Sequence, residues 1–245
     1  MRDEDGYFDE HVAARVDTTW ADLAERAIVD PMVDFLAALA GNGRALELGI
    51  GTGRIALPLA ARGVDVHGIE LSKAMTARLR AKPGGDAIAV TIGDFSTAKA
   101  DGPFRLVYLV ANTIMNLTTQ NAQVACFANV ASHLEPGGRF VIEVGVPGLQ
   151  RLPPGDRFQV FDASETHWGI DEYDVANQGL ISHHFWTGEG RLERFAAPFR
   201  YVWPAELDLM ARMAVLRLRE RWAGWQHEPF TSDSTKHVSV WEKPS

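Results

Sequence analysis

Between residues 44 and 146, short apolar runs alternate with runs of helical periodicity, and this alternation constrains the fold more than any other feature. The apolar runs cover residues 44–48, 65–70, 87–92, 104–110 and 139–144. Helical spacing follows in residues 54–62 and 72–80, and in a longer run that ends before Glu135-Pro136-Gly137-Gly138. Strands that are apolar along their whole length are typical of a parallel sheet covered by helices on both faces. The chain is therefore predicted to be a doubly wound α/β protein.

The segments on either side of this alternation differ from it. Residues 1–40 are predicted to be helical, whereas residues 147–203 alternate between apolar and polar positions and are rich in aromatic residues. Gly188-Glu189-Gly190 is typical of a hairpin turn, so residues 147–203 are expected to form a small antiparallel β insertion. The last predicted elements are a helix at 204–214 and strands at 215–222 and 237–241. Residues 1–245 are thus predicted to form one domain.

Charge and composition limit the partners of the chain. The net charge of −8 disfavours binding to a phosphate backbone or to anionic lipid. No apolar run approaches the ~20 residues that a membrane span needs, and the acidic N-terminal segment is unlike a secretory signal. Cys126 is the single cysteine, so no intramolecular disulfide can form. We expect a cytoplasmic protein that acts neither on nucleic acid nor at a membrane.

The most specific segment is the glycine-rich turn in ALELGIGTGRIALPLA, between the first predicted strand and helix. It holds Gly49, Gly51 and Gly53, with Glu47 two residues before the first glycine. Glycine accepts backbone angles that other residues resist and lets a ligand approach the main chain. A dinucleotide-binding fingerprint would place its third glycine where this chain has Arg54.

The glycine turn and four later segments, in the same order and at similar spacing, resemble the class I S-adenosylmethionine-dependent methyltransferases. The later segments are VHGIELS, IGDF, LVYLVANTIMNL and LEPGGRFVIEV. The resemblance implies a Rossmann-like sheet of seven mostly parallel strands, with the last strand antiparallel. It also implies S-adenosylmethionine as the methyl donor and S-adenosylhomocysteine as the product.

The resemblance assigns cofactor contacts to residues at the ends of the first two strands. The loop of Gly49, Gly51 and Gly53 would pack against the methionine part of the cofactor, with Glu47 near its amino group. Glu70 would accept hydrogen bonds from both ribose hydroxyls, and Leu71 follows it.

Further cofactor contacts are implied at later strand ends and in the N-terminal segment. Asp94 would face the adenine amino group and Phe95 the adenine ring, while Ala111 would lie near the reacting methyl group. Tyr7 belongs to a helical flap, residues 1–40, that closes over the cofactor in many members of the family. This chain has Val16 where the family often has a tyrosine, so the contacts of the flap are not settled by the resemblance.

A purely structural role remains an alternative for the acidic residues. Glu70 precedes Ser72 and Asp94 precedes Ser96, so either carboxylate could cap a turn or helix. Ligands of open α/β sheets bind at the carboxyl ends of the strands, where all these acids lie. Their common position therefore favours ligand binding.

Methyl transfer is an in-line displacement in which the cofactor supplies the activated group, so the protein mainly aligns the reactants. An amine acceptor needs only to be neutral, whereas a hydroxyl or an acidic carbon calls for a general base. The candidates for a base or a substrate anchor are Glu143, His167, Tyr173, His183 and His184. Adjacent His183 and His184 must point to opposite faces of a strand, so at most one points inward. As alternatives, Glu143 ties a loop, and the histidines and most aromatic residues of the insertion are structural.

The sequence predicts transfer of a methyl group to N, O or C of a small-molecule acceptor and no metal site, because no zinc-like ligand spacing is present. A non-catalytic module that binds the cofactor is an alternative. A nicotinamide-dependent reductase is a further one, although neither its fingerprint nor a Tyr-x-x-x-Lys pair occurs. The oligomeric state, including a homodimer, is left open.

Overall fold

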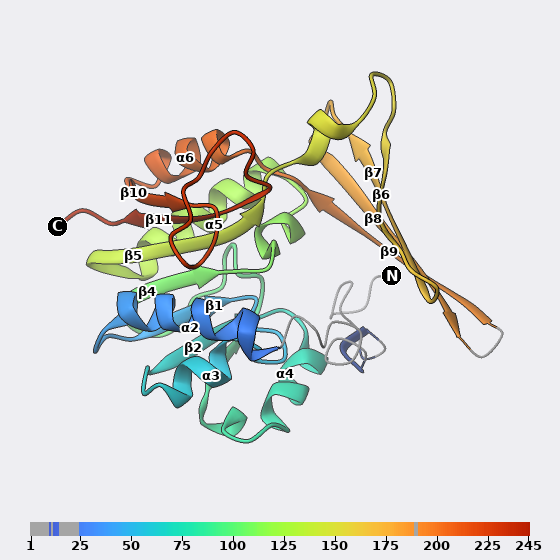
Figure 1. Ribbon diagram of the computed structural model, residues 1–245. Helices are drawn as coiled ribbons and strands as arrows, with labels where there is room; N and C mark the ends of the chain where they lie inside the picture. The colour runs from blue at the N-terminus through green and yellow to red at the C-terminus, as the bar shows by residue number, and fades with distance from the viewer. Residues whose placement is uncertain (1–9, 11, 15–24, 189–190) are drawn as a thin grey trace.

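The computed structural model describes residues 10, 12–14, 25–188 and 191–245, and its main body contains a seven-stranded sheet with helices around it (Figure 1). The strand order is β10-β11-β5-β4-β1-β2-β3. The strands are β1 (Ala45–Leu48), β2 (Val66–Glu70), β3 (Ala89–Ile92), β4 (Phe104–Leu109), β5 (Leu134–Gly145), β10 (Arg217–Trp222) and β11 (Lys236–Glu242). Pairing is parallel from β3 through β5, and β11 is antiparallel to both of its neighbours. The predicted doubly wound, mostly parallel sheet with an antiparallel last strand is confirmed.

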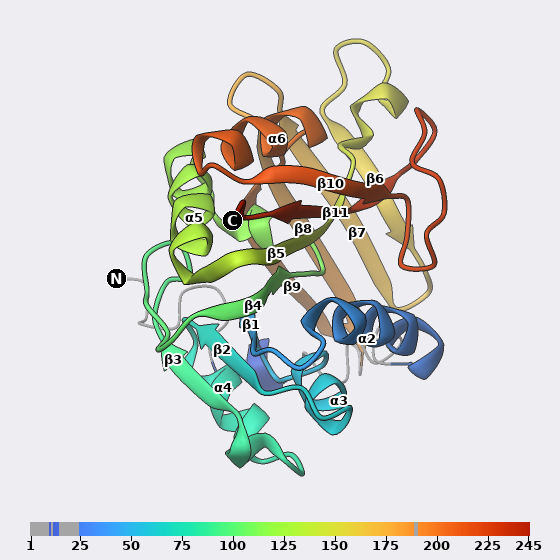
Figure 2. The same ribbon diagram turned by 90° about the vertical axis from the view of Figure 1, so that its left-hand side faces the viewer.

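Helices cover both faces of this sheet, because its central strands are apolar on both sides (Figure 2). One core cluster joins α2 (Arg26–Ala40) and α3 (Ala56–Ala61) to the sheet and includes Leu79 of α4 (Lys73–Arg80). The other cluster lies under α5 (Gln120–His133) and α6 (Pro204–Met213). In β1, for example, Ala45 faces the first cluster while Leu46 and Leu48 face the second.

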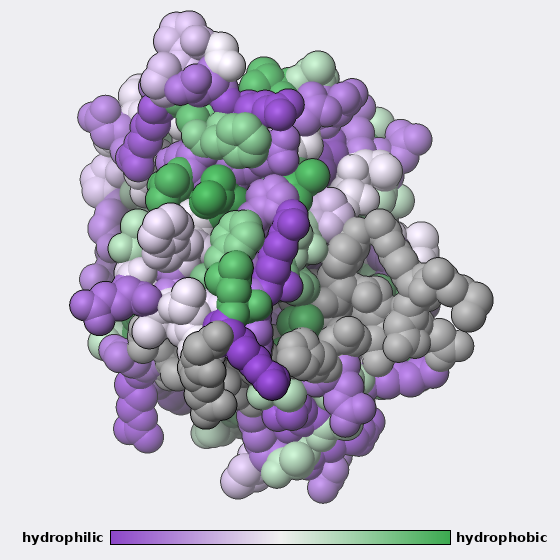
Figure 3. Space-filling view, turned by 90° about the vertical axis from the view of Figure 1, so that its right-hand side faces the viewer, coloured by the Kyte–Doolittle hydropathy of each residue, from purple (hydrophilic) through white to green (hydrophobic). Residues whose placement is uncertain are grey.

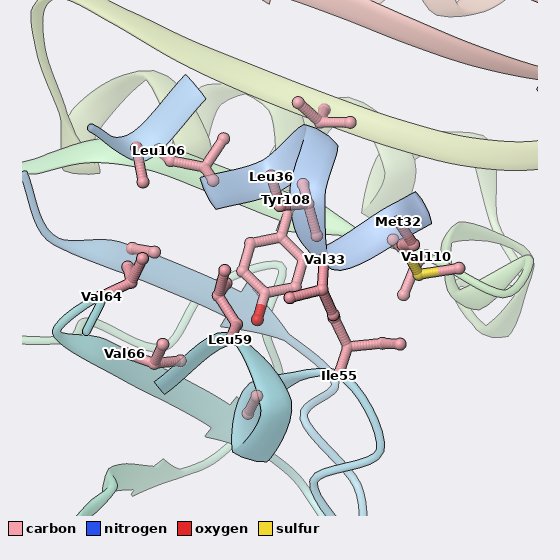
Figure 4. Close-up of a cluster of buried hydrophobic side chains, with 14 of the residues drawn as sticks. Met32, Val33, Leu36, Ile55, Leu59, Val64, Val66, Leu106, Tyr108 and Val110 are labelled. Carbon is pink, nitrogen blue, oxygen red and sulfur yellow. The ribbon is translucent and has the colours of Figure 1, made fainter. Parts of the chain in front are cut away.

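Tyr108 of β4 lies inside the first cluster, among apolar side chains of α2 and α3 such as Val33, Leu36 and Leu59 (Figure 4). The side chain is fully buried, and its hydroxyl donates a hydrogen bond of 2.9 Å to Oε2 of Glu47 on β1. A buried phenol needs such a partner, since an unsatisfied polar group in an apolar core is costly.

A second, four-stranded antiparallel sheet lies beyond the end of β5 and confirms the expected antiparallel β insertion (Figure 1). Its strands, in spatial order, are β6 (Phe158–Ala163), β7 (His167–Asp174), β8 (Gly179–Gly188) and β9 (Arg191–Arg200). The chain enters it through the short helix η4 (Gly148–Arg151) and leaves it for α6. Gly188 pairs with Arg191, so β8 and β9 form the expected hairpin, although residues 189–190 lie outside the described residues.

Several element boundaries differ from the predictions. Helix α5 ends at His133, and the following Leu134 to Gly138 belong to β5, where a bulge opposite Phe104 and Leu106 accommodates them. Strand β10 begins at Arg217 because Val215 has a φ of 60° that no strand residue adopts. Among the described residues, no helix is long and apolar enough to cross a membrane.

Candidate active site

The strand order reverses between β1 and β4, and two loops meet at that point. The chain runs from β1 toward β2 on one side and from β4 toward β5 on the other. The glycine loop after β1 and the turn after β4 therefore lie side by side at the carboxyl ends of neighbouring strands. In open α/β sheets this switch point is where ligands bind.

The glycine loop needs its glycines for both conformation and space. Gly49 and Gly53 have φ angles of 70° and 82°, which other residues adopt only with strain. A Cβ at Gly49 would lie 2.7 Å from the side chain of Thr113, and one at Gly53 would lie 2.3 Å from that of Leu79. A Cβ at Gly51 would come no closer than 4.0 Å to a neighbouring atom, the carbonyl oxygen of Gly49, and Gly51 lines the cavity. Lys82 supports the loop by donating 2.9 Å to the carbonyl of Thr52.

Glu47 lies under this loop as a buried acid at the cavity wall. Burial raises its pKa to about 8, although the hydrogen bond from Tyr108 and the positive charge of Arg54 oppose this shift. A carboxyl group in this position is stabilised in its charged form by a ligand cation, because the cation replaces the lost solvation. The site therefore fits the amino group that the resemblance assigns to Glu47.

Glu70 ends β2 and ties the glycine loop to the start of α4. Its Oε2 accepts 2.8 Å from the N–H of Gly51, and its Oε1 accepts 2.9 Å from the N–H of Ser72. The N-cap of α4 is Ser72 itself, whose Oγ accepts from the N–H of Met75, so Glu70 does not cap the helix. Leu71 beside it is exposed.

Asp94 and Phe95 follow β3 and lie in different environments. Asp94 is exposed and one of its oxygens accepts 2.8 Å from the N–H of Ser96, which closes a local turn. Phe95 is buried in the second core cluster, with its ring edge close to the Cβ position of Gly49. Glu70, Leu71, Asp94 and Phe95 lie at the strand ends but outside the lining of the main cavity. Their cofactor contacts stay predictions.

The turn after β4 is strained and held by Glu143. Ala111 and Asn112 have φ angles of 56° and 61°, so two consecutive non-glycine residues adopt the left-handed conformation. The N–H of Ala111 donates 2.8 Å to Oε2 of Glu143, and Asn112 Oδ1 accepts 2.7 Å from the N–H of Gly145. Glu143 therefore contacts the backbone of this turn, as the loop-tying alternative describes, and it does not line the cavity.

A cavity of about 690 Å³ connects the two loops with the second sheet. The glycine loop and residues 110–113, 115 and 116 form one wall, and side chains of β6 to β9 together with Tyr201 form the other. The second wall carries aromatic residues and a few polar ones. Its members are Phe161, Asp171, Tyr173, Leu180, Ser182, His184, Phe195, Phe199 and Tyr201.

Alternation along β7 and β8 decides which candidates face this cavity. We call the face of the second sheet that carries Asp171, Tyr173, Ser182 and His184 the inner face. Burial raises the pKa of Asp171, although Ser182 and the nearby charge of His183 lower it, and burial also raises that of Tyr173 to about 12. Gly169, opposite His184, leaves room for the ring of Phe161, which a Cβ there would approach to 2.2 Å.

The two other predicted histidines lie on different faces. His167 is on the inner face beside His184 but is not part of the cavity lining. His183 points to the outer face, where its Nε2 lies 3.4 Å from a carboxylate oxygen of Glu172. The outer face is apolar and exposed at Val160, Trp168 and Ile181, and Figure 3 shows the molecule from this side.

Sequence reasoning missed Asp171 and Ser182 of the inner face and the Tyr108–Glu47 pair. The alternation of β7 placed Asp171 on the face of Tyr173, so this signal was available for Asp171. Tyr7 lies outside the described residues, so its role stays a prediction. In the part of the chain that the structure describes, no three or more His, Cys, Asp or Glu side chains are arranged so that they could hold a metal ion.

Known proteins resemble this chain in sequence and in structure. The family described as "Methyltransferase domain" matches residues 45–138. The CcbJ methyltransferase from Streptomyces caelestis is 36% identical, with a TM-score of 0.88 over 99% of this chain and 100% of that chain. The cypemycin N-terminal methyltransferase from Streptomyces sp is 27% identical over 201 residues, which are 81% of this chain and 82% of that protein. The S-adenosylmethionine-bound amino pentose methyltransferase CalS10 from Micromonospora echinaspora is 21% identical, with a TM-score of 0.66 over 99% of this chain and 100% of that chain.

Proposed function

The chain belongs to the class I S-adenosylmethionine-dependent methyltransferases, and we propose that it methylates an amine nitrogen of a small molecule. In this proposal the acceptor lies between the glycine loop and the inner face of the second sheet. The observation that carries the proposal is the single cavity that joins these two walls. The alternatives of a nicotinamide-dependent reductase and of a non-catalytic module have no support from the relatives.

Residues of the first wall, together with Glu70 at the end of β2, fit the cofactor. Glu47 would accept from its amino group, and the backbone at Gly51 would adjoin its methionine part. Each carboxylate oxygen has two lone pairs, so Glu70 can accept from a ribose diol beside its bonds to Gly51 and Ser72. The bound cofactor supplies a methyl group on a positively charged sulfur. The protein then needs to align a nucleophile and exclude water.

An amine acceptor is favoured first by the named relatives. The cypemycin methyltransferase, at 27% identity, is named for an N-terminal acceptor. CalS10 is named for an amino pentose, although a likeness at 21% identity supports only the fold. The name of the cypemycin methyltransferase therefore supports nitrogen as the acceptor atom.

The chemistry of the second wall favours the same class. Asp171 is half-buried on this wall, and a cation would favour its ionised form. Phe161, Phe195 and Phe199 line the same cavity and add aromatic surface that attracts cations and covers apolar groups. An ammonium group on an apolar body matches this combination of one acid and several rings.

The decisive experiment supplies isotope-labelled S-adenosylmethionine with amines and with their hydroxyl analogues of the same carbon skeleton. We expect methyl transfer to the amines, with the new methyl carbon bound to nitrogen in the product spectrum. Methylation of the hydroxyl analogues in preference to the amines would overturn the choice of nitrogen.

Replacing Asp171 by asparagine tests the anchor for the ammonium group. Hydrogen bonds to charged groups contribute about 1.5–3 kcal/mol, so we expect KM for a cationic amine to rise roughly 10- to 100-fold. The affinity for S-adenosylhomocysteine should stay unchanged, because Asp171 belongs to the other wall. An unchanged KM would show that the cation binds elsewhere.

The proposal retains the expectations of a cytoplasmic enzyme with an acceptor other than nucleic acid. The net charge of −8 supports the second expectation, because phosphate backbones require a basic surface. It also retains residues 147–203 as an insertion on the acceptor side of one domain. Its support is that β6 to β9 contribute to the cavity wall.

A further inference from the structure

Three side chains of the second sheet form a continuous hydrogen-bonded chain. Nδ1 of His167 lies 2.5 Å from Oδ2 of Asp162, and Nε2 of His167 lies 2.9 Å from Nδ1 of His184. Beyond them, Nε2 of His184 lies 3.3 Å from the hydroxyl of Ser182. The two imidazole rings are nearly parallel to each other and to the ring of Trp186, which holds their orientation.

This hydrogen-bonded chain of side chains leads from the cavity toward solvent. His184 lines the cavity, whereas His167 and Asp162 are not part of its lining. The side chain of His167 is 17% exposed and that of Asp162 is 40% exposed. The far end of the chain is therefore the end in contact with water.

The carboxylate of Asp162 determines which nitrogen atoms of His167 and His184 carry a proton. An ionised carboxylate only accepts, so Asp162 fixes the proton of His167 on Nδ1, and this hydrogen bond lowers the pKa of Asp162. Nε2 of His167 then accepts from Nδ1–H of His184, which leaves Nε2 of His184 with a free lone pair. Its contact with Ser182 is long, so a ligand donor can take the place of that hydroxyl.

The proposed amine acceptor requires a group that removes a proton from it. An alkyl amine is almost entirely protonated near neutral pH, and an ammonium group has no lone pair with which to attack a methyl carbon. Burial lowers the pKa of His184 to about 4, so its ring is neutral and able to accept a proton at neutral pH. A base of such low pKa holds a proton poorly, and efficient removal requires passing it on.

We propose that Nε2 of His184 takes the proton that the acceptor ammonium must lose, and that His167 and Asp162 pass a proton on to solvent. The N–H bond of the acceptor breaks, its electron pair stays on nitrogen, and a bond forms to Nε2 of His184. The proton on Nδ1 of His184 moves to Nε2 of His167, and the proton on Nδ1 of His167 moves to Asp162 and then to water. One proton leaves the acceptor and one enters solvent. The inference rests on the proposed amine acceptor, with His184 as catalytic residue and His167 and Asp162 as positioning residues.

Few charged groups face His184 from the strands around it. Opposite it on β9 is Phe195, and across the cavity Arg54 and Lys82 contribute to the lining. The titratable groups of the second sheet that act on its pKa are Asp162 on β6, His167 on β7 and His183 on the other face of β8, and Asp171 on β7 lines the same cavity. A titration near neutral pH in this region is thus assigned by replacing these residues one at a time.

The test compares two acceptors of similar shape, an alkyl amine and a weakly basic amine that is neutral at pH 7. General-base groups contribute about 10²- to 10⁴-fold, so His184→Asn should lower kcat for the alkyl amine by that factor. With the neutral amine the loss should stay below about threefold, which also shows that the variant is folded. At high pH the variant should recover activity toward the alkyl amine about tenfold per pH unit. Equal losses with both amines would overturn the role of His184.

The positioning residues are tested by a readout independent of activity. Nitrogen NMR of the imidazoles in the full-length protein should show His167 protonated at Nδ1 and His184 at Nδ1. In Asp162→Ala, which removes the acceptor oxygens, these tautomers should change, and kcat for the alkyl amine alone should fall. Unchanged tautomers in Asp162→Ala would overturn the hydrogen-bonded chain even if no amine proves to be an acceptor.

A matched control uses the neighbouring histidine on the other face of β8. His183→Asn should change kcat for either amine less than threefold, since its side chain contacts Glu172 away from the cavity. A loss equal to that of His184→Asn would mean that damage to the second sheet, and not proton transfer, explains the kinetics. If the wild-type enzyme methylates no amine, the proposed function fails, and the NMR result still decides the hydrogen-bonded chain.

Discussion

At the scale of single residues, Glu47 is expected to couple cofactor binding to pH. Its pKa is raised to about 8 by burial, so between about pH 4.5 and 8 the folded chain keeps a proton that the unfolded chain releases. Because the folded state binds this proton and the unfolded state does not, the contribution of Glu47 to the free energy of unfolding falls as pH rises through that window. The ammonium group of a bound cofactor would stabilise the ionised form of Glu47, so cofactor binding should release a proton from Glu47 below about pH 8.

Calorimetry of S-adenosylhomocysteine binding measures this release. At pH 7, a group with a pKa of about 8 is about nine-tenths protonated, so titrations in phosphate and in Tris should differ by close to 0.9 of the difference in buffer ionisation enthalpy. Glu47→Gln should abolish this difference. Identical heats in both buffers for the wild-type chain would contradict the assignment of Glu47 to the amino group.

Glu143 offers a second test at this scale, because its two candidate roles respond differently to the same substitutions. As a tie for Ala111, it needs only an acceptor oxygen, so Glu143→Gln should keep kcat within about fivefold. Glu143→Ala leaves the strained turn without this bond, which contributes about 1.5–3 kcal/mol, and should lower kcat roughly 10- to 100-fold. Complete loss of activity in Glu143→Gln, with unchanged thermal stability, would instead identify Glu143 as the base.

At the scale of elements, Arg200 at the end of β9 connects the second sheet to the main body. Its guanidinium donates to Glu206 of α6 at 2.8 Å and to Gln178 of the β7–β8 turn at 3.1 Å, and it also contacts Gln123 of α5. Arg200 is only 5% exposed, and breaking a buried pair leaves an uncompensated charge. We expect Arg200→Ala to lower the free energy of unfolding by about 3 kcal/mol and to raise KM for the acceptor.

The control for this prediction is Arg194→Ala on the same strand. Arg194 is exposed and its guanidinium lies 5.8 Å from the ring centroid of Phe185, so its replacement should change stability by less than about 1 kcal/mol. Denaturant unfolding and acceptor kinetics of the two variants give the comparison. An Arg200→Ala variant with wild-type stability would show that other contacts hold the second sheet.

The central elements could be predicted from sequence because burial on both faces leaves a direct pattern, whereas the contacts between strands on the inner face of the second sheet could not. The uninterrupted apolar runs gave β1, β2 and β4 within two residues. By contrast, the contact between His167 and His184 depends on the register in which Gly169 faces His184. A shift of one residue would reverse the faces of the strand, and no turn motif sets that register from the sequence alone. The bond from Tyr108 to Glu47 likewise depends on pairing between β1 and β4, which are distant in sequence.

At the scale of the whole molecule, the two sheets share one cavity and are joined through Arg200 and α6, so they are expected to unfold together. Saturation with S-adenosylhomocysteine at about a hundred times its dissociation constant adds ~2.7 kcal/mol, which corresponds to a rise of ~5–10 °C in Tm for a chain of this size. One calorimetric transition should shift as a unit, because ligand energy reaches every element that unfolds cooperatively with its site.

Hydrogen exchange distinguishes this cooperative unit from two independent ones. Bound S-adenosylhomocysteine should slow exchange in residues 49–53 and 111–116 by local contact, and in β8 near Arg200 through the shared global opening. The far end of the β8–β9 hairpin, near Gly188 and Arg191, should keep its exchange rate because it frays locally. A second thermal transition whose midpoint does not change when S-adenosylhomocysteine binds would mean that the second sheet folds on its own. In that case Arg200→Ala should raise KM for the acceptor without lowering the Tm of the main sheet, and the kinetics of this variant would agree with the hydrogen-exchange result.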